Sequence, residues 1–247
     1  MSNLLGREGL SGFYPTYVSA PPKSILRSLQ AASKAAETQN RSPRKGSARI
    51  LGVHLEGPFL NPAFAGAHEK RFIRKPSWKE AKTWWEAAGP LLKIVTLAPE
   101  TSGAMPVIRY LAAKGVKVQM GHSGATAPMA REAERAGASG VTHLFNAMGV
   151  ELAEYALRSR TLMTEIIPDG VHVSRELLEY TLERRPRNKV VFVSDACAAS
   201  GFAPGHRGKF SGKSVWTSPD GSIRRNDGTL AASGCIISHL KIPLKPS

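Results

Sequence analysis

Short runs of apolar residues alternate with amphipathic stretches along most of the chain. Seven of the runs are rich in β-branched and apolar residues at consecutive positions. This pattern is typical of parallel strands that are covered on both faces of a sheet. The predicted strands span residues 13–19, 49–55, 92–98, 116–120, 141–145, 162–167 and 189–194.

Helical patterns with recognisable ends separate these strands. Ser77 and Glu80, for example, have the spacing of a capping box, and the helix they open stops at Gly89. The predicted helices span residues 23–38, 77–89, 101–115, 126–137 and 174–182. Repeated alternation of strand and helix predicts an α/β fold with a parallel sheet.

The last part of the chain has a different pattern. Residues 214–229 contain a turn at Asp220-Gly221 between two short β-like runs. Residues 203–209 are interpreted as a flexible loop because they contain proline and two glycines. We therefore expect a barrel-like region over residues 1–205, followed by a partial β appendage and a C-terminal tail over residues 206–247.

Composition excludes several classes of protein. The chain has 247 residues, of which 42% are hydrophobic, so it can form a sizeable core. Cys197 and Cys235 are its two cysteines, too few for a disulfide framework or a four-thiolate zinc site. No apolar run approaches the roughly 20 residues of a membrane span, and the N-terminal residues lack the apolar core of a signal peptide. We expect a cytoplasmic protein that does not bind membranes.

The formal net charge of +15 permits an anionic partner. The basic residues are dispersed, however, and form only short clusters at residues 41–49 and 184–189. Zinc fingers, RNP signatures and basic regions followed by heptads are all missing from the sequence. A solvated basic surface is therefore the preferred interpretation, and nucleic acid is not an expected partner.

Residues of the types that can bind metals or transfer protons follow the predicted strands. In a (β/α)₈ barrel, the C-terminal ends of the strands meet at the face that carries the active site. A carboxylate and two imidazoles from different strands can hold one divalent metal there and leave a position for water. One strand-end histidine alone is more often structural, but the coincidence at five strand ends favours a site. These residues are His54 with Glu56, His122, His143, Asp169 with His172, and Asp195.

A rival interpretation places a nucleophile at Ser123. The segment Gly121–Ala125 (GHSGA) follows a strand and precedes a helix, as a nucleophile elbow does. Ser123, Asp195 and His206 have a plausible chain order for a hydrolase triad. The segment ends in Ala125 instead of glycine, and no HGGG-type oxyanion segment is present, so a serine hydrolase remains a minor alternative.

Taken in order, the motifs of the chain resemble those of the N-acetylglucosamine-6-phosphate deacetylases of the amidohydrolase superfamily. Together they extend over nearly all of the sequence. The motifs are LGVHLEGPFLN at 51–61, GAH at 66–68, VTLAPE at 95–100, GHSGAT at 121–126, THLFNAM at 142–148, DGVHV at 169–173, VSDA at 193–196 and DGTLA at 227–231.

The resemblance implies a (β/α)₈ TIM-type barrel and a metal-dependent hydrolysis of the acetamido group of N-acetylglucosamine 6-phosphate or a related amino sugar. Glu56, His122 and His143 would hold one divalent metal, zinc or iron. Asp195 would be the general base and acid, and His172 would position the amide. The other residues that would line the sugar site are Ala67, His68, Asn146, Ala147, Leu230 and Ala231. Family members are homodimers, so a homodimer is expected here.

Three features depart from the family pattern. No His-x-His pair precedes the strand at residues 13–19, so the barrel is expected to be incomplete, with about seven strands. Glu154 stands near the position of an arginine that contacts the sugar phosphate in the family, and Arg158 or Arg160 would have to replace it. The ending at residues 235–247 also differs from the closing helix of the family. A catalytically weak or inactive truncated relative is therefore the main alternative.

Overall fold

A curved sheet of seven parallel strands forms the centre of the protein. The computed structural model describes residues 1–234. The order of the strands in the sheet, β2-β4-β5-β6-β7-β8-β9, is also their order along the chain, and all neighbours are parallel. The strands are β2 (Thr16–Val18), β4 (Val53–Glu56), β5 (Leu92–Leu97), β6 (Lys117–Met120), β7 (Ala138–Val141), β8 (Met163–Ile166) and β9 (Val190–Phe192). The fold is thus an incomplete barrel of the TIM type, as predicted.

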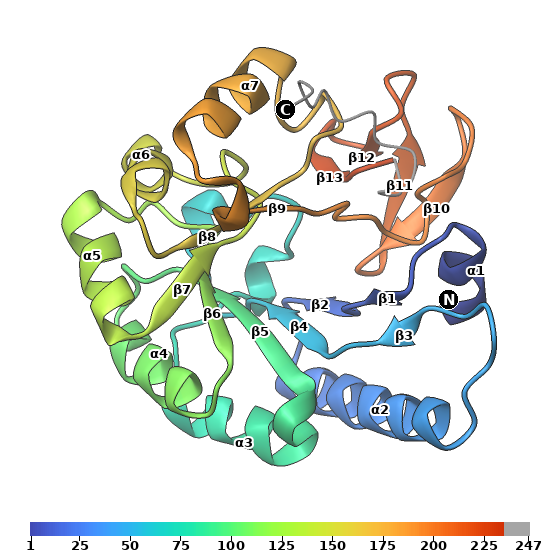
Figure 1. The fold of residues 1–247 in the computed structure, drawn as a ribbon, viewed down its shortest axis with the longest axis horizontal. Helices are drawn as coiled ribbons and strands as arrows, with labels where there is room; N and C mark the ends of the chain where they lie inside the picture. Colours follow the sequence, from blue (N-terminus) through green and yellow to red (C-terminus); the bar gives the residue numbers. More distant parts are fainter. Residues whose placement is uncertain (235–247) are drawn as a thin grey trace.

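Helices cover the outer side of the curved sheet (Figure 1). They are α2 (Pro22–Arg41), α3 (Trp78–Ala88), α4 (Ala104–Ala113), α5 (Ala127–Ala136), α6 (Val150–Arg158) and α7 (Arg175–Arg184), and a short α1 (Ser2–Arg7) precedes them. The described residues also form four 3₁₀ turns, η1 (Pro62–Phe64), η2 (Lys70–Phe72), η3 (Gly89–Leu91) and η4 (Arg187–Lys189). None of the helices in residues 1–234 combines the length and apolar character that a membrane crossing requires.

The helix ends show why several boundaries were predictable. The Ser77 hydroxyl accepts a hydrogen bond from the Glu80 amide, and the Ser174 hydroxyl accepts one from the Leu177 amide, so both predicted caps are confirmed. The prediction of a helix start at Thr101 is wrong by about one turn. The Thr101 hydroxyl donates to the Ala98 carbonyl instead, and α4 begins after Gly103.

The core lies between the sheet and its helices. Leu29 of α2, Trp84 of α3 and Leu111 of α4 are fully buried, as the helical period predicts. Trp84 stacks on Phe59, with 4.8 Å between the ring centroids. This continuous apolar layer supports the strand ends from which the site residues project.

A second, four-stranded antiparallel sheet follows the barrel strands. It consists of β10 (Arg207–Phe210), β11 (Lys213–Thr217), β12 (Ile223–Arg225) and β13 (Leu230–Ala232), in that order. The predicted turn at Asp220-Gly221 connects β11 and β12, whereas the prediction of a loop over 203–209 is wrong because β10 occupies part of it. The division into regions 1–205 and 206–247 remains a prediction, and Cys235 lies outside the described residues.

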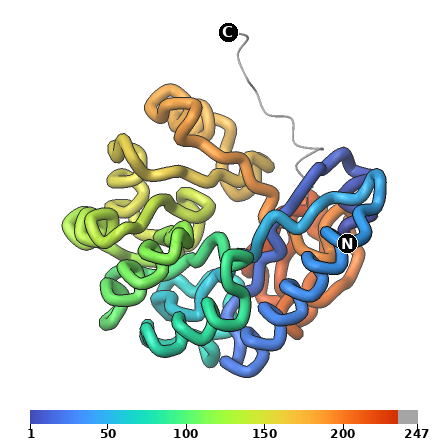
Figure 2. Tube along the Cα trace, turned by 60° about the horizontal axis from the view of Figure 1, so that its bottom comes forward, coloured from blue at the N-terminus to red at the C-terminus, as the bar shows by residue number. Residues whose placement is uncertain are grey.

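This second sheet lies beside the N-terminal segment and close to the end of β9 (Figures 1 and 2). Ser233 forms a parallel bridge with Ala196, and its amide donates to the Asp195 carbonyl. A small parallel pair, β1 (Gly12–Phe13) and β3 (Arg49–Ile50), lies near the start of the chain. Within residues 1–234, the outer edges of β2 and β9 have no further strand partner.

Candidate metal centre and active site

Glu56, His122 and His143 meet at the C-terminal ends of three strands. Glu56 is the last residue of β4, and the two histidines follow β6 and β7. Glu56 Oε1 lies 2.8 Å from His122 Nε2 and 3.0 Å from His143 Nε2, and the two nitrogens are 3.2 Å apart. All three side chains are buried. The arrangement offers one carboxylate oxygen and two imidazole nitrogens to a single point.

The hydrogen bonds of His122 indicate that a cation fits between these groups. His122 Nδ1 lies 2.8 Å from the Phe64 carbonyl oxygen, which only accepts, so Nδ1 carries a hydrogen. In the neutral ring, Nε2 then presents a lone pair to the Glu56 carboxylate. Burial lowers the pKa of His122 and favours that neutral form. A divalent metal removes the conflict between the two lone pairs, and a backbone carbonyl on the distal nitrogen is a common support for a metal-bound histidine.

Opposing effects set the charges of the other two members of this group. Burial alone would raise the pKa of Glu56, but the adjacent His122 and His143 rings outweigh it and hold that pKa well below the usual range. Burial alone would lower the pKa of His143, but the hydrogen bond with Glu56 raises it to about 9. The carboxylate is thus kept ionised in a buried position. An ionised, buried carboxylate beside two imidazoles matches the oxygen and nitrogen ligands that zinc accepts.

The backbone is strained at the same positions. His122, His143, Ala147 and Asp195 have φ values of 49°, 32°, 47° and 48°, in the left-handed region. Each such non-glycine conformation costs of order 1–3 kcal/mol and persists where the surroundings impose it. Positive φ values at His143 and Phe145 also explain why the strand predicted over 141–145 is wrong, since β7 ends at Val141.

Asp195 and His172 complete the polar wall of the site. Asp195 follows β9, and burial, together with the nearby Glu56 carboxylate, raises its pKa. A carboxyl group with a raised pKa can accept and return a proton. His172 Nδ1 lies 2.7 Å from Asp169 Oδ2, so the ring donates to that carboxylate and turns its Nε2 edge elsewhere. Burial would raise the pKa of Asp169, but the hydrogen bond with His172 dominates and lowers it.

His68 reaches the group from the loop after β4. Its Nε2 lies 3.7 Å from Glu56 Oε1. Its Nδ1 accepts from the Ser19 amide at 3.2 Å, which leaves the Nε2 hydrogen of the neutral ring on the side of Glu56. His68 therefore faces the same carboxylate as His122 and His143. His54 does not: its Nε2 bonds to the Thr96 hydroxyl at 2.7 Å, within the barrel.

One cavity of about 380 Å³ is lined by every residue to which the family resemblance assigns a role in metal binding, proton transfer or contact with the sugar ring, whereas His54 and Asp169 do not line it. The members with assigned metal or proton-transfer roles are Glu56, His122, His143 and Asp195. The predicted substrate residues Ala67, His68, Asn146, Ala147, His172, Leu230 and Ala231 also line it. The structure therefore brings together residues from five strand ends and from the second sheet. Their individual roles remain predictions.

Glu100 was not predicted as a site residue, although it connects the loops around Glu56, His122 and His143. Its Oε1 accepts from Asn61 Nδ2 at 2.8 Å and from the Gly124 amide at 2.7 Å, and its Oε2 accepts from the Ser123 hydroxyl at 2.7 Å. It thereby connects the loop after β4 to the loop that carries His122. Its position after β5, within the motif at 95–100, was the available signal.

A chain of hydrogen bonds inside the barrel was also missed. Thr142 Oγ1 donates to Gln119 Oε1 at 2.6 Å, and Gln119 Nε2 donates to Glu165 Oε1 at 2.7 Å. Because the Thr142 hydrogen is used there, the 2.7 Å contact of Thr96 Oγ1 with Thr142 Oγ1 has Thr96 as donor. His54 Nε2 then donates to Thr96. The chain passes directly beside His143, the residue after Thr142.

The geometry does not support the serine-hydrolase alternative. The Ser123 hydroxyl donates to Glu100, and His206 stacks on Phe202 with 3.9 Å between ring centroids. His206 does not line the cavity that contains Asp195. Ser123, Asp195 and His206 thus do not form a triad.

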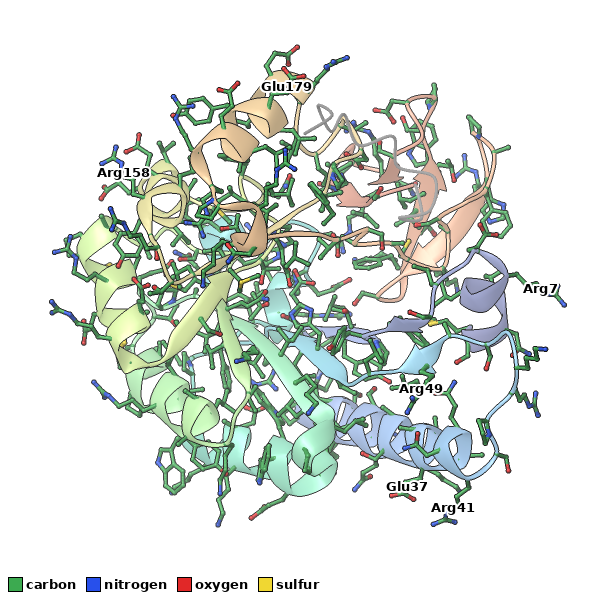
Figure 3. All side chains as sticks on the ribbon, viewed as in Figure 1. Arg7, Glu37, Arg41, Arg49, Arg158 and Glu179 are labelled. Atoms are coloured by element: carbon green, nitrogen blue, oxygen red, sulfur yellow. The ribbon has the colours of Figure 1, made fainter. Side chains whose placement is uncertain are left out.

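The position of Glu154 also differs from the expectation. Glu154 is exposed on α6 and pairs at 3.0 Å with Arg158, which lies at the outside of the molecule in Figure 3. Neither residue lines the site cavity, and Arg160 does not line it either. Among residues 1–234, the wall of that cavity contains no lysine or arginine. A replacement for the phosphate-contacting arginine is therefore not found at Arg158 or Arg160.

Comparisons with known proteins agree with this geometry. The chain is 35% identical to the N-acetylglucosamine-6-phosphate deacetylase of Bacillus subtilis (strain 168) over 241 residues, which cover 94% of the chain and 59% of that protein. It is 33% identical to the N-acetylgalactosamine-6-phosphate deacetylase of Escherichia coli O157:H7, with 92% of the chain and 60% of that protein covered. This chain is a relative of the amino-sugar-phosphate deacetylases. No family model matches it.

Solved deacetylase structures have the same fold. The N-acetyl-D-glucosamine-6-phosphate deacetylase of Mycobacterium smegmatis, solved as a mutant in complex with N-acetyl-D-glucosamine-6-phosphate, superposes with a TM-score of 0.85 at 28% identity, covering 94% of this chain and 60% of that one. The Thermotoga maritima deacetylase gives a TM-score of 0.83 at 28% identity, covering 97% and 68%. The chain spans about 60% of the length of the curated deacetylases described above.

Proposed function

We propose that the chain hydrolyses the acetamido group of N-acetylglucosamine 6-phosphate or a related N-acetyl amino-sugar phosphate. Water adds to the amide carbonyl, the carbon–nitrogen bond breaks, and acetate and the free amine are formed. The observation that carries the proposal is the convergence of Glu56, His122 and His143 beside Asp195 in one cavity. The similarity of the chain to deacetylases of two amino-sugar phosphates supports the proposed substrate class.

Glu56, His122 and His143 would hold one zinc or iron ion. Such an ion, when bound, lowers the pKa of water and polarises a carbonyl. Asp195 has the raised pKa and the partly buried position that suit it to take a proton from the attacking water and to deliver it to the leaving amine. His172 would position the substrate amide with its Nε2 edge, because Asp169 holds its Nδ1–H and so fixes the orientation of the ring.

The walls of the cavity would orient the sugar. Ala67 and His68 come from the loop after β4, Asn146 and Ala147 come from the loop after β7, and Leu230 and Ala231 come from β13. Small side chains leave room for a pyranose ring, and the Asn146 amide can bond a hydroxyl. We also retain the predictions of a homodimer and of a cytoplasmic location, which sedimentation and cell fractionation would test.

Metal content and acetate release test the proposal together. We expect the purified chain to bind up to one zinc or iron ion and to release acetate from N-acetylglucosamine 6-phosphate in a chelator-sensitive reaction. His122→Ala should lose both metal and activity. Asp195→Asn should keep the metal, while kcat falls roughly 10²–10⁴-fold, because a general base typically contributes that much.

His206→Ala is the matched control, because it removes a histidine that does not line the cavity. It should retain both metal and activity. Unchanged metal content in His122→Ala would remove this residue from the site. Hydrolysis that resists chelators would contradict metal dependence, and a metal-loaded protein without acetate release would favour the inactive-relative alternative.

A further inference from the structure

A second cavity, of about 570 Å³, lies between α6 and α7. It shares no lining residue with the site cavity. Arg158 and Arg184 are the last residues of the two helices, so the cavity lies where these helices end. Helices of a β/α barrel run opposite to its strands, and this end is therefore remote from the strand ends that carry Glu56 and Asp195.

The wall of this cavity is strongly cationic. It contains four guanidinium groups, from Arg158, Arg160, Arg184 and Arg185, and a single carboxylate, from Glu154. Glu154 pairs with Arg158 at 3.0 Å, which leaves three positive charges without a carboxylate of this wall. Like charges gathered in a concave site raise the local concentration of anions.

Two of the arginines have little to hold them in the protein. Arg160 makes no hydrogen bond or ion pair with any residue of the described part of the chain. The Arg184 guanidinium lies 3.4 Å from the centroid of the Tyr180 ring and makes one long hydrogen bond, of 3.4 Å, with the Tyr180 carbonyl. Stacking on an aromatic face leaves the edge of a guanidinium group available to a planar or tetrahedral anion.

Arg185 adds a buried positive charge to the wall of this cavity. Its side chain is buried, with 3% of the residue exposed, although it carries a charge. Its terminal nitrogens donate to the carbonyl oxygens of Ser159 and Leu162, but Nε has no hydrogen-bond partner among residues 1–234. Glu134, the carboxylate that acts on Arg185 electrostatically, accepts hydrogen bonds from Ser159 and Thr161 and does not line the cavity. A buried charge without a direct anionic partner is costly unless an anion compensates it.

Helix ends offer only a partial explanation for this cluster. A basic residue in the last turn interacts favourably with the negative end of the helix dipole. This effect accounts for Arg158 and Arg184, which end α6 and α7. It does not account for Arg160, which lies beyond α6, or for the unpartnered Nε of Arg185.

We infer that this cavity binds a small phosphate-bearing anion. Guanidinium groups form paired hydrogen bonds with phosphate oxygens, and several of them can share one phosphoryl group. The volume falls within the range of small-molecule sites and accommodates a sugar monophosphate as well as free phosphate. A dianion suits an excess of three positive charges better than a monocarboxylate does.

Titration calorimetry on the full chain tests this inference. Inorganic phosphate, glucose 6-phosphate and acetate are the three probes, at constant ionic strength. We expect saturable binding of about one phosphate or sugar phosphate per chain and far weaker binding of acetate. A clear preference between the two phosphate probes identifies free phosphate or a phosphate ester as the ligand.

Variants locate the binding. Arg160→Gln and Arg184→Gln should each weaken phosphate binding about tenfold or more, since a charge-assisted hydrogen bond contributes about 1.5–3 kcal/mol. Glu154→Gln should strengthen binding several-fold, because it removes the one negative charge of the wall. Arg185 is left intact, because its guanidinium also binds two backbone carbonyls.

Arg175→Gln is the matched control, because this arginine is the first residue of α7 and pairs with Glu179, and neither residue lines the cavity. It should leave binding unchanged. Absence of saturable binding would overturn the inference. So would an equal loss in Arg175→Gln, which would show diffuse attraction to a basic surface, or tighter phosphate binding in Asp195→Asn, which would place the phosphate in the other cavity.

Discussion

Glu165 is the last acceptor of the hydrogen-bond chain inside the barrel, in which each group from His54 onward donates to the next. It is 8% exposed, and among residues 1–234 its one hydrogen bond with another side chain comes from Gln119. Burial, opposed by Gln119, raises its pKa to about 7. The folded protein therefore holds a proton on Glu165 at pH values where an unfolded chain does not.

This residue should make stability depend on pH. The pKa of Glu165 is higher in the folded state than in the unfolded state. Its contribution to the free energy of unfolding is therefore fully present below the unfolded pKa near 4.5 and is lost as pH rises through about 7. We expect Glu165→Gln to raise the free energy of unfolding by about 1–3 kcal/mol at pH 8 and to have little effect at pH 4.5. Urea unfolding at both pH values measures the difference.

Glu132→Gln provides the control for this experiment, because it makes the same chemical change at an exposed position of α5. Its unfolding curves should follow those of the unchanged chain at both pH values. A Glu165→Gln variant that is less stable at pH 8 would show that the carboxylate is ionised and favourable in the fold.

The antiparallel sheet is attached to the barrel by a buried carboxylate. Glu69, in the loop that carries Ala67 and His68, lies within 3.6 Å of Lys213 on β11 and of Arg225 on β12. Arg71 adds a third cation at 3.3 Å. Because β12 pairs with β13, this ion cluster positions Leu230 and Ala231 at the wall of the site cavity.

Glu69→Gln should therefore affect substrate binding more than metal binding. The substitution leaves Arg225 partly buried without its carboxylate, which costs about 1–3 kcal/mol of stability. We expect KM for the amino sugar to rise several-fold, kcat to change less than about twofold, and metal content to stay constant. Steady-state kinetics and elemental analysis give the three quantities.

Glu86→Gln is the matched change, since Glu86 pairs with Lys82 on the exposed side of α3. It should alter neither constant. A Glu69→Gln variant with unchanged KM would show that the second sheet keeps its position without this cluster.

At the scale of the helices and strands, local sequence signals were sufficient to predict some elements but not others. Capped helices and doubly covered strands were predictable because their signals lie within ten or so consecutive residues. β10 was not, since it is an edge strand whose residues alternate between exposed and partly exposed positions, next to glycines typical of loops. The strand-end ligands could be predicted in the same way, whereas the roles of Glu100 and Gln119 depend on which distant loops the fold brings together.

At the scale of the whole molecule, the positive net charge and the contacts that would fix a phosphate group are separate properties. The net charge of +15 attracts phosphorylated sugars from a distance, and this attraction weakens with salt. The site cavity, however, has no lysine or arginine in its wall within residues 1–234. A diffuse field raises the rate of encounter but does not fix the position of a phosphate group.

We therefore expect weak discrimination by this chain between phosphorylated and unphosphorylated substrates. The ratio of kcat/KM for N-acetylglucosamine 6-phosphate to that for N-acetylglucosamine should lie below about tenfold at physiological salt, where no bidentate contact adds to steering. The ratio should rise at low ionic strength. A large, salt-independent preference would point to a phosphate contact outside the described wall of the cavity.

The order of the seven parallel strands has a consequence for assembly. Each strand from β5 to β9 pairs with the strand made just before it, and β4 pairs with β2, so the sheet grows by nearest-neighbour addition during synthesis, without long loop closures. Glu56, His122 and His143 belong to the units of β4, β6 and β7. All three proposed metal ligands have thus been made before β9, and the Asp195 that follows it, leaves the ribosome.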